Sequence, residues 1–152
     1  MIIDQNKLKD FIIDSGLIPK TAVDAAEKEI KEKQGDFSEA LLRLGGISEE
    51  NLRKIQAYVV GIPFVDLKGQ KIPFEILSMI PEPIARRHNS IAFRKTDGGL
   101  EVAMLDIDDF EAINFIEKKT QLKILPRLSD VESIKSGLLQ YQKSLKEEFG
   151  DI

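Results

Sequence analysis

The first sixty residues carry one pattern of apolar and polar positions twice. When residues 7–23 are placed over residues 36–52, apolar residues coincide at one constant offset, the 29 positions that separate Gly16 from Gly45. The coinciding pairs are Leu8 with Phe37, Ile12 with Leu41, Ile13 with Leu42, Ile18 with Ile47 and Val23 with Leu52. A fixed offset carried by apolar residues and one glycine indicates an internal structural repeat.

Each copy has the pattern of a helical hairpin. The apolar residues recur at helical spacing, and the glycine lies where the first helix should end, because glycine accepts the left-handed conformation of a helix cap. A helix-start signal follows each glycine, Pro19 in the first copy and Ser48 in the second. Because neither hairpin can bury its own apolar face, we expect the two to stack against each other.

The hydrophobic period changes after Gly61. Pro63 prevents a helix, and residues 64–67 can form a short strand or an extended linker. Two short amphipathic helices are predicted between residues 71 and 89, because a proline opens each segment.

The next stretch has the pattern of a small sheet. Residues 90–96 and 100–105 read as paired strands around a hairpin turn. A helix over residues 108–119 and a third strand over residues 122–125, ended by Pro126, complete a crossover that should be right-handed.

A capping box opens the last predicted helix, because Ser129 is followed by Glu132 three residues later. This helix is expected to end near Lys143. The chain is therefore predicted to be an α+β protein in three parts. These are an N-terminal helical hairpin repeat (residues 1–61), a small mixed α/β subdomain (residues 62–143) and the start of a charged linker (residues 144–152).

Composition narrows the class of protein. Apolar residues make up 42% and charged residues 32% of the chain, which is typical of a globular protein. No apolar run approaches the roughly 18 residues of a membrane-spanning helix, so we expect no direct membrane insertion. The chain has no cysteine, which excludes disulfides and thiolate metal sites. A net charge of −4, with the charges interspersed, gives no support for a nucleic-acid polymer as partner.

Few residues point to catalysis. The sequence has no G-x4-G-K-[ST] phosphate loop, and a nucleophile system would depend on His88, the only histidine. The place of His88 at the end of a short helix favours interaction with the helix dipole instead. Asp106, Asp108 and Asp109 suggest a Mg²⁺ site, but capping of the following helix explains them better. We therefore predict that this chain is not an enzyme and holds neither metal nor cofactor.

Two features of the sequence are candidate binding sites. Arg86 and Arg87 can face a phosphate or an acidic partner, although a solvated edge is commoner. The glycine turns expose backbone amides near helix ends, and two stacked hairpins would leave a groove for a flat anionic ligand. Core packing explains the same apolar residues equally well, so the periodicity alone leaves both interpretations open.

Three stretches in a fixed order resemble the N-terminal domain of the type II secretion and type IV pilus assembly ATPases. They are LLRLGGISEENLRKIQAYVVGIPFVDL, IPEPIARRHNSIAF and GGLEVAMLDIDDFEAINFI, the last with Ile107 where the family usually has proline. The resemblance implies a non-catalytic regulatory and docking domain that precedes an ATPase domain in the parent chain. It also implies an inner-membrane platform protein as partner, at the cytoplasmic face of the bacterial inner membrane. A stand-alone adaptor without an ATPase is a further alternative.

Part of that family binds cyclic di-GMP through two copies of [RK]LGxxLxxxGxIxxxxLxxxLxxQ, whose spacing equals the distance from Gly16 to Gly45. The resemblance implies a candidate ligand site at the positions of the two copies that keep the motif residue or carry another apolar residue in its place. These positions are Lys7, Leu8, Ile12, Gly16, Ile18, Val23, Phe37, Leu41, Gly45, Ile47 and Leu52.

Other positions depart from the motif. The first copy has Lys9, Glu27 and Ile30 in place of glycine, leucine and glutamine. The second copy has Asp36, Ser38, Gln56 and Val59 in place of the basic residue, glycine, leucine and glutamine, and Phe37 replaces a leucine. A side chain at a glycine position would crowd the ligand, and an aspartate would repel an anion. We therefore expect a docking domain, with a cyclic di-GMP receptor as the alternative.

Overall fold

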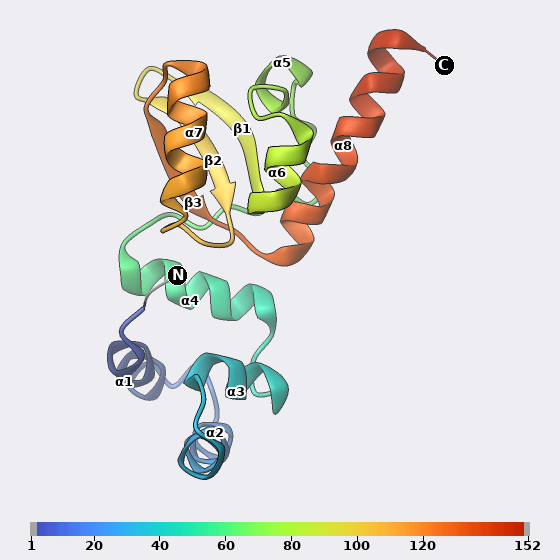
Figure 1. The fold of residues 1–152 in the computed structure, drawn as a ribbon. Coiled ribbons are helices and arrows are strands. Elements are labelled where there is room, and N and C mark those ends of the chain that lie inside the picture. Colours follow the sequence, from blue (N-terminus) through green and yellow to red (C-terminus); the bar gives the residue numbers. More distant parts are fainter. Residues whose placement is uncertain (1–2, 151–152) are drawn as a thin grey trace. The chain divides into compact units, whose positions relative to one another are not determined.

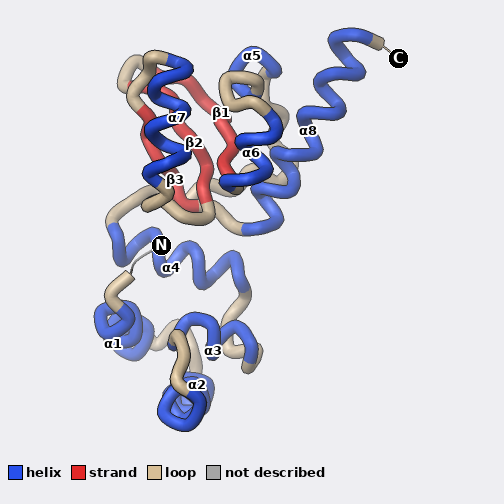
Figure 2. Tube along the Cα trace, viewed as in Figure 1, coloured by secondary structure: helices blue, strands red, loops and turns tan. Residues whose placement is uncertain are grey.

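The computed structural model describes residues 3–150 except for the side chain of Glu148. The chain divides into two compact units, one up to Gly61 and one from Ile62 onward. Residues 3–150 form eight helices and one three-stranded sheet, shown in blue and red in Figure 2. The predicted α+β fold class, with a helical N-terminal part, is confirmed.

The N-terminal unit consists of four helices (Figure 1). They are α1 (Gln5–Ser15), α2 (Lys20–Lys33), α3 (Phe37–Arg43) and α4 (Glu49–Val60). Helices α1 and α2 form one hairpin, and α3 and α4 form the next. All four helices contribute buried apolar side chains, so the unit has a hydrophobic core of its own.

The turns of the two hairpins have matching backbone geometry. Gly16 and Gly45 have φ values of +66° and +73°, in the region that favours glycine. Each donates its amide to the carbonyl three residues earlier, Gly16 to Ile13 at 3.4 Å and Gly45 to Leu42 at 3.2 Å. The repeated glycine in the sequence is therefore explained by the turn that it forms.

The two hairpins differ at their first helix. Asp36 is the N-cap of α3, and its carboxylate accepts a hydrogen bond from the Ser38 amide at 2.7 Å. The equivalent residue of the first copy, Lys7, lies inside α1, which begins earlier behind the N-cap Asp4. Because Asp36 starts the helix at this position, α3 has 7 residues and α1 has 11.

The C-terminal unit is organised around a mixed sheet of order β1-β2-β3. Its strands are β1 (Ser90–Thr96), β2 (Gly99–Met104) and β3 (Ile124–Leu128). Strand β2 pairs antiparallel with β1 and parallel with β3. A side chain at Gly99 would collide with the carbonyl of Lys123, so glycine is required where the hairpin meets the third strand.

Four helices belong to this sheet: α5 (Phe74–Leu77), α6 (Glu82–His88), α7 (Phe110–Thr120) and α8 (Val131–Phe149) (Figure 1). Helix α7 connects β2 to β3 and packs against β3, while α5, α6 and α8 pack against β1. The hydroxyl of Tyr141 on α8 lies 2.7 Å from the carbonyl oxygen of Ile80, and burial raises its pKa.

Two elements extend well beyond their predicted ends. Strand β3 continues through Pro126 to Leu128, because an edge strand tolerates a residue that lacks an amide donor. Helix α8 continues past Lys143 to Phe149, through a segment rich in helix-forming lysine, glutamate and leucine. Most of the expected linker is therefore helical, and its residues 151–152 lie outside the described residues.

Candidate functional site

Most residues of the candidate ligand site lie in the core of the N-terminal unit. Seven of the eleven are buried: Leu8, Ile12, Ile18, Val23, Phe37, Leu41 and Leu52. Lys7, Gly16 and Gly45 are exposed, and Ile47 is half-buried. A fully buried side chain such as Leu8, Ile12 or Leu41 holds the hairpins together and does not contact a ligand unless the unit opens. The accessible positions are therefore Lys7 on α1 and the residues near the two turns.

The turns of the two hairpins line a common cavity of about 740 Å³. Leu17 and Ile18 come from the first turn, and residues 45–48 come from the second. Asn51 and Lys54 of α4 add a carboxamide and an ammonium group, the latter paired with Glu50 at 3.6 Å. Three of the predicted residues (Ile18, Gly45 and Ile47) therefore share one cavity.

The predicted residues of the first turn line a second cavity, of about 360 Å³. Gly16, Ile18 and Val23 lie in its wall together with Ile13 and Lys20. The first turn therefore contributes to two neighbouring cavities, because Ile18 lines both.

A third cavity, of about 260 Å³, is lined by the three positions where the first copy departs from the motif. These positions are Lys9, Glu27 and Ile30. The ammonium of Lys9 on α1 lies 2.8 Å from the Glu27 carboxylate on α2, and this hydrogen bond raises the pKa of Lys9. The residues that replace glycine and leucine of the motif therefore interact with each other.

The second copy carries uncharged polar residues at the two equivalent positions. Ser38 and Gln56 are both buried, and Ser38 donates a long hydrogen bond of 3.5 Å to the side-chain oxygen of Gln5. Within the described residues, the buried side-chain oxygen of Gln56 has no hydrogen-bond partner. Asp36 is in addition the N-cap of α3. The motif positions of the second copy therefore make different contacts from those of the first copy.

The arginines predicted to bind a partner lie in the last turn of α6. The Arg86 guanidinium forms a 2.9 Å ion pair with Glu82, and that of Arg87 lies 3.9 Å from Glu111. Both side chains remain largely exposed, at 59% and 72%. They are therefore accessible to a partner, but each already has an acidic neighbour.

The aspartates considered for Mg²⁺ cap the start of α7. Asp109 accepts the amide of Ala112 at 3.1 Å, and its other oxygen lies 2.7 Å from Nδ1 of His88. Asp106 accepts the amide of Asp108 at 2.9 Å. Between residues 3 and 150, the structure groups no set of side chains suited to hold a metal ion. No helix in that range is long and apolar enough to cross a membrane.

Sequence reasoning missed a buried charge on the central strand. Arg94 and Arg127 both donate to the carboxylate of Glu101, which is buried. The hydrogen bond from Arg94 lowers the pKa of Glu101 more than burial raises it. A glutamate inside the otherwise apolar stretch LEVAM was the available signal, and we interpret this cluster as structural because one carboxylate satisfies both guanidinium groups.

The fold is that of an N-terminal domain of secretion and pilus ATPases. Residues 60–148 match the MshEN domain family, and the chain belongs to this family. The match confirms the resemblance seen in the sequence motifs.

Curated relatives agree with this assignment. The type IV pilus assembly ATPase PilB of Myxococcus xanthus is 23% identical over 96% of this chain, and PilB of Thermus thermophilus is 26% identical over 83%. The chain spans 26% and 14% of the length of these two proteins.

Solved structures share the fold. MshE with cyclic di-GMP superposes with a TM-score of 0.69 at 21% identity, covering 88% of this chain and 97% of that chain. The N-terminal domain of XpsE gives a TM-score of 0.60 at 20% identity, covering 92% and 98%.

Proposed function

We propose that this chain is a non-catalytic regulatory and docking domain of a type II secretion or type IV pilus assembly ATPase. The main support for this proposal is that nearly the whole chain aligns with about one quarter of a pilus assembly ATPase. The sequence contains no phosphate loop, so ATP hydrolysis falls to another part of the parent protein. The domain binds an inner-membrane platform protein at the cytoplasmic face of the bacterial inner membrane.

The exposed arginines of α6 support an acidic partner surface. Arg86 and Arg87 lie in the last turn of the helix with largely exposed side chains, and their guanidinium groups can exchange Glu82 and Glu111 for partner carboxylates. Exposed ion pairs are weak, so this exchange costs little.

The test is a binding titration of the chain with the cytoplasmic region of a platform protein. We expect the double change Arg86→Glu and Arg87→Glu to weaken binding more than tenfold. The matched control, Lys118→Glu with Lys119→Glu, makes the same charge change in the last turn of α7 and should leave binding unchanged. Absence of binding by the unaltered chain contradicts the docking function, whereas equal loss in both variants contradicts the assignment to α6.

A cyclic di-GMP receptor is the second candidate. Two observations favour it: the 740 Å³ cavity between the glycine turns, a size typical of ligand sites, and the fold shared with MshE. We rank it below docking without nucleotide, because Lys9 and Glu27 occupy motif positions as an ion pair and Asp36 adds a negative charge.

Calorimetry separates the two candidates. At tens of micromolar chain, we expect no heat on addition of cyclic di-GMP. The control is Gly16→Val, which strains the first turn and should lower stability without any change in the titration. A clear titration with micromolar affinity, lost in Gly16→Val while the circular dichroism stays native, would reverse the ranking.

A further inference from the structure

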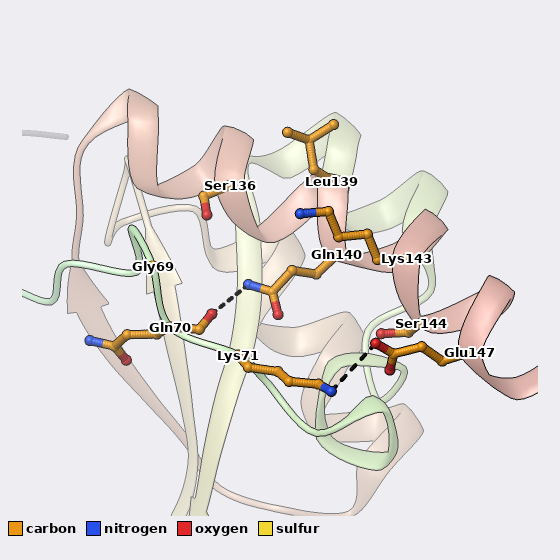
Figure 3. A pocket seen from close by; sticks show the side chains of 9 residues that line it. All are labelled: Gly69, Gln70, Lys71, Ser136, Leu139, Gln140, Lys143, Ser144 and Glu147. Atoms are coloured by element: carbon orange, nitrogen blue, oxygen red, sulfur yellow. Dashed lines mark hydrogen bonds and ion pairs between the residues drawn. The ribbon is translucent and has the colours of Figure 1, made fainter.

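A cavity of about 320 Å³ lies in the C-terminal unit, apart from the hairpin repeat and from Arg86 and Arg87. One wall is a continuous face of α8, formed by residues three, four and seven positions apart. The other wall is residues 69–71 of the segment 66–72, which we call the strap (Figure 3). The α8 residues are Ser136, Leu139, Gln140, Lys143, Ser144 and Glu147.

Specific side-chain contacts fix the strap against α8. The carboxamide of Gln140 donates to the carbonyl of Gln70 and accepts the amide of Ile72, each at 2.8 Å. Nearer the start of α8, the ammonium of Lys68 lies 3.0 Å from the Asp130 carboxylate. The two walls are thus held together on both sides of Ser136, so the cavity is preformed and costs a ligand little ordering.

The lining carries one unmatched positive charge. Lys71 of the strap lies 3.4 Å from Glu147, whereas Lys143 has no ion pair or hydrogen bond within residues 3–150. Figure 3 shows Lys143 on one side of Gln140 and Lys71 on the other. Because Lys71 is paired with Glu147, the remaining charge is that of Lys143, which matches one added carboxylate. Inorganic phosphate has no apolar group to cover Leu139.

The backbone of the strap adds unused hydrogen-bonding groups. Neither the amide nor the carbonyl of Gly69 or Lys71 forms a hydrogen bond in the described part of the chain. Leu139 is 59% exposed at the same cavity. Because Gly69 lies in a turn, with a φ of +76°, these groups are single hydrogen-bonding points for a ligand and not the edge of a strand.

We propose that this cavity binds an acidic peptide segment of a partner protein. One carboxylate of the segment pairs with Lys143, and an adjacent apolar side chain covers Leu139. Polar groups of the segment form hydrogen bonds with the backbone of Gly69 and Lys71.

The test uses the full 152-residue chain labelled with ¹⁵N and two matched probes, acetyl-Leu-Asp-Leu-amide and acetyl-Leu-Asn-Leu-amide. We expect saturable shifts of the Gly69, Lys71 and Lys143 amide signals with the acidic probe at millimolar concentration. The neutral probe should bind about fivefold more weakly than the acidic probe. This ratio is the effect of one charge pair near 4 Å in water. Equal affinities, or no saturable shift, would overturn the proposal.

Two variants and one ion complete the experiment. Lys143→Glu should remove the preference for the acidic probe, whereas Lys146→Glu makes the same change on α8 outside the cavity and should preserve it. Inorganic phosphate should shift the same signals less than the acidic probe does. Stronger binding of phosphate, or equal effects of the two variants, would contradict a carboxylate site at Lys143.

Discussion

At the scale of single residues, Lys9 and Glu27 show how a ligand motif can change without loss of the fold. Each replaces a residue that the motif requires, and their 2.8 Å ion pair joins α1 to α2. Both side chains are substantially exposed, so the pair itself adds little stability. Its main consequence is for ligand access to the cavity that they line with Ile30.

Restoring the first copy of the motif tests this interpretation. We expect the triple change Lys9→Gly, Glu27→Leu and Ile30→Gln to produce measurable heat with cyclic di-GMP, because it removes the ion pair and reopens the glycine position. Lys28→Gly on α2 provides a control outside this cavity. If the triple variant is folded but gives no heat with cyclic di-GMP, these three positions are not what prevents binding.

The carboxylate of Asp130 should make the stability of the protein depend on pH. Burial would raise its pKa, but hydrogen bonds from Ser133 and Lys68 lower it below the ordinary value. A lowered folded-state pKa stabilises the protein above the unfolded value of about 4, and this contribution is lost as pH falls through the folded-state pKa.

Substitution at Asp130 should therefore have a pH-dependent effect. Asp130→Asn keeps an N-cap for α8 but loses the charge, so its deficit in unfolding free energy should shrink below about pH 4. Asp130→Ala also loses the cap and should cost about 1 kcal/mol more at neutral pH. Urea denaturation from pH 7 to pH 3 measures both, with Asp24→Asn as an exposed control. A constant deficit across this range would rule out the charge as its source.

At the scale of elements, turns were more predictable than contacts. The cap of the last helix was predicted wrongly, because the N-cap of α8 is Asp130 and not Ser129. Gly16 and Gly45 report their backbone conformation directly, and the strand pair around Gly99 follows from local alternation. The cavities depend on residues distant in sequence, such as Gln70 and Gln140, which are 70 positions apart. No local pattern pairs such residues, and so the strap and its cavity could not be predicted from one sequence.

The packing of α8 on the sheet depends on one glycine that the sequence patterns did not explain. A Cβ atom at Gly137 would lie 2.8 Å from Cγ1 of Ile91, a side chain without exposed surface on β1. Gly137 therefore allows the close approach of α8 to β1, at a cost in helix propensity of about 1 kcal/mol.

We expect Gly137→Ala to destabilise the chain, although alanine is the better helix former. Overpacking a buried site typically costs about 1–3 kcal/mol, which exceeds the propensity gain of up to about 1 kcal/mol. Lys135→Gly provides a propensity control at an exposed position of the same helix. In a double-mutant cycle, Ile91→Ala should relieve part of the loss of unfolding free energy caused by Gly137→Ala. If Gly137→Ala is instead more stable than the unaltered chain, the backbone of α8 shifts without cost.

At the scale of the whole molecule, each compact unit has a core of its own. The large cluster of buried apolar residues contains only positions from Leu67 to Tyr141. The N-terminal unit buries a separate set on its four helices, including Leu8, Ile12 and Leu41. Units with separate cores are expected to fold independently, and a unit of about 60 residues is the more marginal one because it buries a smaller fraction of its surface.

The domain boundary read from the sequence can be tested by cutting the chain at Gly61. We expect the intact chain to unfold in two transitions, one for each unit. A fragment of residues 62–152 should unfold cooperatively at nearly the same urea midpoint as this unit does in the intact chain, because its sheet, its helices and its buried cluster are all retained. A fragment of residues 1–61 should keep helical circular dichroism but unfold at a lower urea concentration. Shifting the cut to the middle of α4, after Ile55, gives the control, since it should leave the N-terminal fragment without part of its core. Loss of cooperative unfolding in residues 62–152 alone would mean that the two units stabilise each other, and the chain would then have to be treated as one domain.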